Sequence, residues 1–118
     1  MFGHRVPEIS VQEVAQKLAR GDQFYLIDVR EPAELLYATL GDEPLLVPMS
    51  LLAEQGIAAL PEVVRQNKTA EIVVFCHHGV RSAQVVAWMQ HHGWQNVFSM
   101  AGGIDAYAVQ VDPKIGRY

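Results

Sequence analysis

The chain has 118 residues, of which 50% are apolar and 19% are charged. These proportions exclude a disordered tail, and the length suits a single domain over residues 1–118. The 9 basic and 13 acidic residues give a formal net charge of −4 without any basic block, so we expect no nucleic-acid partner. No apolar run approaches the ~20 residues that cross a bilayer, so we expect no membrane partner and a cytoplasmic location.

The first predicted elements are a short strand, a capped helix and a buried strand. Glu8-Ile9 suits a very short strand. Residues 10–13, Ser-Val-Gln-Glu, have the form of a capping box. Apolar residues then recur at helical spacing up to Gly21, which suits a left-handed C-cap. Residues 24–29 form a nearly continuous apolar run, which predicts a strand buried on both faces.

Short elements are expected in the middle of the chain. Pro32 suits the first position of a short helix. Residues 45–47 form a brief apolar run that ends before a proline. Residues 50–66 predict one or two helices, with breaks at Gly56 and Pro61.

The last third of the chain repeats the pattern of strand and helix. Residues 72–75 are the clearest buried strand, and Cys76 stands at its C-terminal end. Residues 80–92 predict a helix and residues 97–100 a final strand, which Gly102-Gly103 ends. Apolar strands that alternate with helices predict an α/β fold, in which helices cover both faces of a mainly parallel sheet.

Residues that follow the predicted strands are expected to form one site, because open parallel sheets bind ligands beyond the carboxyl ends of their strands. They are Asp28 with Arg30, the loop from Cys76 to Ser82, and the double-glycine turn. A strand-to-helix loop turns successive N–H groups toward one centre, and a helix N-terminus adds positive charge there. We therefore expect the Cys76 sulfur to be held as a thiolate and to be open to solvent.

Cys76 is the only cysteine in the sequence, so no internal disulfide and no Cys-x-x-Cys pair can form. A lone cysteine is either a small buried apolar residue or a reactive thiol, and the loop favours the second interpretation. The histidine pairs His77-His78 and His91-His92 fall at opposite ends of one predicted helix, about 20 Å apart. We therefore predict no metal site, and no cofactor is expected.

Three stretches together resemble the single-domain rhodanese-like sulfurtransferases. They are residues 28–32 with Glu34 (DVREP, then E), residues 75–83 (FCHHGVRSA) and residues 93–97 (GWQNV) leading to the double glycine. The resemblance implies a five-stranded, mainly parallel sheet flanked by helices. It also implies a cysteine that takes a sulfane sulfur from a donor such as thiosulfate or a persulfide. The acceptor would be cyanide, a thiol or a protein.

This resemblance assigns roles within the loop. Cys76 would be the nucleophile and the persulfide carrier, and the backbone amides of residues 77–82 would stabilise its anionic forms. Arg81 would hold the oxyanion end of the donor or brace the loop against an acidic neighbour. His77 and His78 would contact donor or acceptor, or simply lie on the loop surface.

The remaining predicted site residues support the loop or complete its binding surface. Gly79, Val80 and Ser82 complete the substrate-binding loop. Asp28 and Arg30 are expected to tie the adjoining strand end to the loop rather than to touch substrate.

Two other functions remain open at this point. Related phosphatases and arsenate reductases share the fold, but their loops are one residue longer than the six-residue Cys-x4-Arg loop found here. A non-catalytic module that binds a partner or senses oxidation is the other alternative. We expect a monomer or a weak dimer.

Overall fold

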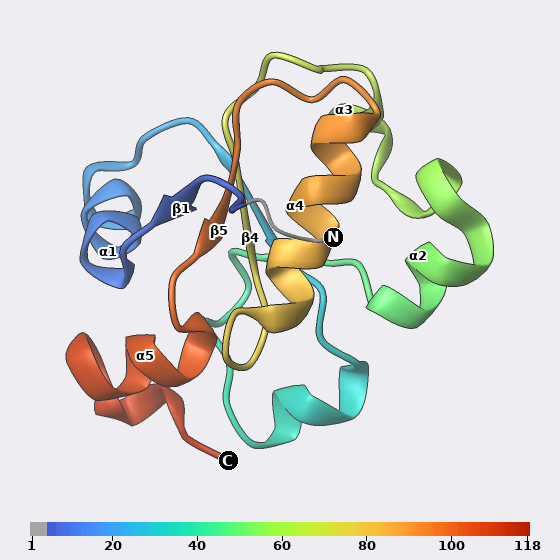
Figure 1. Cartoon of the computed structure of the whole chain (residues 1–118). Coiled ribbons are helices and arrows are strands. Elements are labelled where there is room, and N and C mark those ends of the chain that lie inside the picture. The colour runs from blue at the N-terminus through green and yellow to red at the C-terminus, as the bar shows by residue number, and fades with distance from the viewer. Residues whose placement is uncertain (1–4) are drawn as a thin grey trace.

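The computed structural model describes residues 5–118, so the first four residues of the predicted domain lie outside the described part. One five-stranded sheet runs through the molecule in the order β1-β5-β4-β2-β3 (Figure 1). Its strands are β1 (Glu8–Ile9), β2 (Tyr25–Asp28), β3 (Leu45–Leu46), β4 (Ile72–Phe75) and β5 (Val97–Met100). All neighbouring strands pair in parallel, and the prediction of a five-stranded, mainly parallel sheet is confirmed.

Helices cover both faces of this sheet, as predicted. They are α1 (Val11–Arg20), α2 (Met49–Gln55), α3 (Glu62–Arg65), α4 (Val80–His91) and α5 (Gly103–Gln110). Helices α1 and α5 lie on one face, and α2, α3 and α4 lie on the other (Figure 1). Three short 3-10 helices complete the fold: η1 (Pro32–Leu36), η2 (Gly56–Ala59) and η3 (Pro113–Ile115).

Two hydrophobic cores lie on opposite faces of the sheet, because successive side chains of a strand point in opposite directions. In β4, Ile72 and Val74 belong to the core beneath α2, α3 and α4, whereas Val73 and Phe75 belong to the core beneath α1 and α5. Cys76 lies in the same core as Ile72 and Val74. Burial on both faces explains why this strand reads as an uninterrupted apolar run.

The segment between β2 and β4 differs from the prediction in detail. Pro32–Leu36 forms a 3-10 helix, and residues 50–66 form three short segments, α2, η2 and α3, instead of one or two helices. Gly56 has a φ of +60°, which ends α2. Pro61 directly precedes α3.

The central position of β4 determines where the site lies. Its neighbours are β5 and β2, so the segments that follow all three strands meet at one edge of the sheet. Between residues 5 and 118 we find no helix with the length and apolar character needed to cross a bilayer.

Candidate functional site

Cys76 directly follows β4, and the loop after it leads into α4. The main-chain N–H groups of Gly79 and Ser82 donate hydrogen bonds to the Cys76 sulfur, at 3.1 and 3.3 Å. Gly79 has a φ of +102° at the N-terminus of α4, a conformation that favours glycine. Main-chain dipoles therefore converge on the sulfur.

The sulfur is not open to solvent, and that expectation was wrong. Cys76 is only 1% exposed and is part of the core beneath α2, α3 and α4. The reason is the alternation of the strand, which directs this side chain inward beside Val74. A reactant must therefore enter the loop to reach the sulfur.

Two buried serines extend the hydrogen bonding from the sulfur into the protein. The oxygen of Ser82 lies 3.5 Å from the Cys76 sulfur and 2.8 Å from the hydroxyl of Ser99 in β5. A thiolate can only accept hydrogen bonds, so in that state Ser82 must donate to the sulfur and Ser99 must donate to Ser82. Sequence reasoning missed Ser99, whose only signal was a polar residue in an apolar strand.

The N-terminus of α5 holds the carbonyl groups at the start of the loop. The N–H of Ile104 donates to the Cys76 oxygen at 2.9 Å, and the N–H of Asp105 donates to the His77 oxygen at 3.1 Å. A Cβ atom on Gly103 would overlap the His77 oxygen, so only glycine allows this close approach. The double-glycine turn thereby fixes the path of the loop.

Arg81 forms a two-point ion pair with Glu34 of η1. Its Nη1 and Nη2 donate to the two carboxylate oxygens at 2.7 and 2.9 Å. Glu34 also accepts from the Glu31 N–H at 2.8 Å and from the Tyr118 hydroxyl at 2.7 Å. These donors, Arg81 foremost, lower the pKa of Glu34 to about 2. Arg81 thus braces the loop against η1, and Glu34 joins the site.

Asp28 and Arg30 form a buried ion pair with an N–O distance of 2.8 Å. Arg30 also donates to the Ala38 oxygen at 2.9 Å and to the Tyr118 hydroxyl at 3.1 Å. Among the described residues, neither side chain makes a hydrogen bond to residues 76–82. The pair therefore fixes the end of β2 and the segment after it, and it reaches the loop only through Tyr118 and Glu34.

The C-terminal segment packs against the two loop histidines. The Tyr118 ring stacks on the His77 ring, with 3.7 Å between centroids and 5° between planes, and His77 Nε2 donates to the Tyr118 main-chain oxygen at 2.7 Å. The exposed His78 ring lies 3.8 Å from that of His77. Arg117 donates to Asp105 at 2.8 Å and anchors the segment to α5. No periodicity or motif marked this segment.

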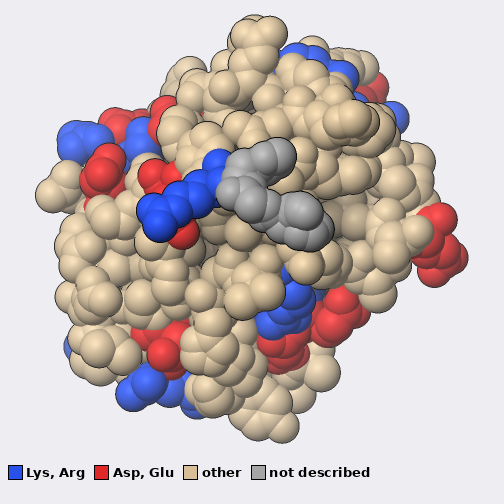
Figure 2. Space-filling model, viewed as in Figure 1, with Lys and Arg blue, Asp and Glu red and all other residues tan. Residues whose placement is uncertain are grey.

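Charged side chains of the site are paired rather than gathered into one basic surface. The pairs are Arg81 with Glu34, Arg30 with Asp28, and Arg117 with Asp105. On the face drawn in Figure 2, basic and acidic groups likewise lie beside each other in small clusters. Within residues 5–118, no three His, Cys, Asp or Glu side chains are grouped so that they could hold a metal ion.

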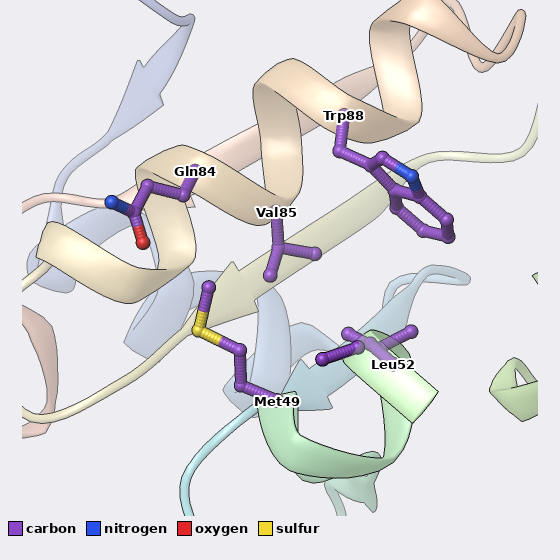
Figure 3. A pocket seen from close by; sticks show the side chains of 6 residues that line it. Met49, Leu52, Gln84, Val85 and Trp88 are labelled. Carbon is purple, nitrogen blue, oxygen red and sulfur yellow. The ribbon is translucent and has the colours of Figure 1, made fainter. Parts of the chain in front are cut away.

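A separate apolar cavity of about 210 Å³ lies between α2 and α4 (Figure 3). Its lining residues are Met49, Leu52, Ala53, Gln84, Val85 and Trp88. None of them belongs to the loop of residues 76–82. The cavity is therefore distinct from the site around the sulfur.

Known proteins resemble this chain in sequence and in fold. The family described as "Rhodanese-like domain" matches residues 10–110. A protein of Allochromatium vinosum named "Sulfurtransferase" is 32% identical over 87% of this chain and 89% of its own length. The "Rhodanese-like/PpiC domain-containing protein 12, chloroplastic" of Arabidopsis thaliana is 35% identical over 96% of this chain, which spans only 38% of that protein. A rhodanese-related protein of Thermoplasma volcanium superposes with a TM-score of 0.66 at 24% identity, over 95% of each chain.

Proposed function

Because the chain belongs to the rhodanese-like domain family, we propose that it is a sulfurtransferase that carries a sulfur atom on Cys76 as a persulfide. The donor is a small sulfane-sulfur compound such as thiosulfate, and the acceptor is thiophilic. One observation supports this proposal above the others: the sulfur of Cys76 accepts two main-chain N–H groups within a six-residue loop. Such an arrangement stabilises a single anionic sulfur.

In the first step, the Cys76 thiolate attacks the outer sulfur of thiosulfate. A bond forms between the two sulfurs, and the bond from the outer sulfur to the sulfonate sulfur breaks. Sulfite leaves with the electron pair, and the negative charge of the enzyme moves to the terminal sulfur of the persulfide. The amides of Gly79 and Ser82 are placed to stabilise the attacking thiolate.

In the second step, the acceptor attacks the terminal sulfur of the persulfide. With cyanide, a carbon–sulfur bond forms, the sulfur–sulfur bond breaks, and thiocyanate leaves. The electron pair returns to Cys76 as a thiolate. No general base is needed in either step, which agrees with the engagement of His77 by Tyr118.

The test combines the intact mass of the protein with turnover. After incubation with thiosulfate, we expect the wild-type chain to gain the mass of one sulfur atom and to form thiocyanate when cyanide is added. The Cys76→Ser variant should do neither. Since serine is close in size to cysteine, its far-UV circular dichroism should match that of the wild type.

The other functions of this fold predict different results. If the wild type gains no sulfur but hydrolyses an aryl phosphate or reduces arsenate, and the Cys76→Ser variant does not, the proposal is wrong and a phosphatase or reductase is present. If neither sulfur uptake nor hydrolysis or reduction is found, the chain is a non-catalytic module. The cytoplasmic location and a thiol or protein as natural acceptor form part of the same proposal.

A further inference from the structure

We propose that Tyr118 is a positioning residue of this site: its hydroxyl fixes Glu34 so that the guanidinium of Arg81 is presented to an anionic reactant. This inference deepens the proposed function, since thiosulfate is such an anion. Its test does not depend on sulfur transfer.

The hydrogen bonds of the Tyr118 hydroxyl have a defined direction. Arg30 Nη1 donates to it at 3.1 Å, and a guanidinium has no acceptor. The single hydroxyl proton is therefore free to go to Glu34 Oε1, which lies 2.7 Å away. Tyr118 thus connects the buried Asp28–Arg30 pair to the carboxylate that holds the loop arginine.

Arg81 keeps donors for a further partner. A guanidinium has five N–H groups, and the structure shows two of them engaged, both by Glu34. The hydrogen bond from Arg81 to Glu34 raises the pKa of the guanidinium, and the nearby charge of Cys76 raises it further. Arg81 is therefore a permanent cation. Its side chain is 30% exposed.

The C-terminal segment is held in place at several points, so Tyr118 is well positioned for this role. Its ring lies against His77, and Arg117 is paired with Asp105. A Cβ atom on Gly116 would overlap the Tyr37 main-chain oxygen, so the segment approaches η1 closely. Tyr118→Phe therefore removes the hydroxyl and leaves these other contacts of the segment in place.

Loss of the Tyr118 hydroxyl should weaken the attraction of an anion to the loop. Glu34 would lose one of its donors, and more of its negative charge would then act on Arg81. The carboxylate would also be free to turn, and the guanidinium would turn with it. Both changes weaken the attraction of an anion to the loop, whereas a neutral reactant is unaffected.

The experiment compares two reagents that alkylate Cys76 and differ in charge. Iodoacetate is an anion, and iodoacetamide is neutral. The measured quantity is the second-order rate of alkylation by iodoacetate divided by that of iodoacetamide. It is compared between the wild-type chain and Tyr118→Phe, which keeps the ring on His77. We expect the ratio to fall about three- to fivefold, the size of one ordinary hydrogen bond. The control is Tyr37→Phe, since Tyr37 is 61% exposed and its hydroxyl bonds to no described residue; its ratio should not change.

Other outcomes overturn the proposal. An unchanged or higher ratio in Tyr118→Phe means that the hydroxyl does not orient Arg81 toward anions. An equal fall with both reagents means that Tyr118 acts only on the general order of the loop. No reaction of the wild type with either reagent means that the loop admits neither reagent to the sulfur, so Arg81 presents no anion to it.

A lower ratio in Tyr118→Phe together with a wild type that transfers no sulfur would refute the proposed function and leave the role of Tyr118 intact.

Discussion

At the level of single residues, the Cys76 sulfur is buried and yet surrounded by donors. Burial alone disfavours a charged sulfur. Two main-chain N–H groups and the Ser82 hydroxyl offset that cost. Cys76 is therefore buried, as the first interpretation of a lone cysteine expects, and its sulfur has the hydrogen-bond donors that the second interpretation requires.

The Ser82 hydroxyl can be tested by its removal. In Ser82→Ala the main-chain N–H remains but the hydroxyl is lost, so the thiolate is less stable. We expect the rate of alkylation by iodoacetamide at neutral pH to fall about fivefold. Ser99 acts on the sulfur through Ser82. The single variant Ser99→Ala should therefore react more slowly than the wild type, whereas adding Ser99→Ala to Ser82→Ala should not change the rate further. A further fall in the double variant would contradict this coupling.

At the level of elements, the loop is held between the two helical layers. Helix α4 begins at the loop and supplies the Ser82 N–H to the sulfur. Helix α5 begins beside the loop and supplies two N–H groups to the loop carbonyls. The connections from β4 to α4 and from β5 to α5 therefore both contribute to the position of the Cys76 sulfur. Gly103, the first residue of α5, makes the closest of these contacts with the loop, at the His77 oxygen.

Two glycines give a matched pair for this contact. In Gly103→Ala the new Cβ overlaps the His77 oxygen, so the loop must move, and we expect sulfur loading to be lost. Gly21 has a similar φ of +72° but no atom within 4 Å of such a Cβ. Gly21→Ala should therefore cost only about 1–2 kcal/mol of unfolding free energy and load sulfur normally. Equal sulfur loading in the two variants would show that the contact with α5 does not shape the loop.

At the level of the whole molecule, the sequence predicted what depends on neighbouring residues. The apolar run of residues 72–75 identified the central strand, and the serine and glycine at the ends of α1 identified its caps. Contacts across long stretches of sequence could not be predicted. Tyr118 is hydrogen-bonded to Arg30 and Glu34, which are 88 and 84 positions away. No local sequence pattern predicts such contacts. The burial of Cys76 could not be predicted, because a strand that is buried on both faces shows no alternation of apolar and polar residues from which the direction of the next side chain could be inferred.

The stability of the whole molecule should depend on pH through Glu34. Its pKa is about 2 in the folded protein, below the ordinary 4.5. Its contribution to stability is therefore present above about pH 5 and is lost as the pH falls toward 2. We expect Glu34→Gln to lower the free energy of unfolding at neutral pH, measured with denaturant, and this difference from the wild type to shrink as the pH falls. A difference that stays constant down to about pH 2 would mean that the charge of Glu34 does not stabilise the fold.

The two outermost strands of the sheet, β1 and β3, have two residues each. A long, unpaired edge strand allows another chain to add a strand to the sheet, which leads to aggregation. Short edge strands are one way in which proteins avoid this. A strand of another copy of the chain could pair with only two residues at either edge of the sheet. Continuous β-sheets that run from one molecule into the next are therefore disfavoured.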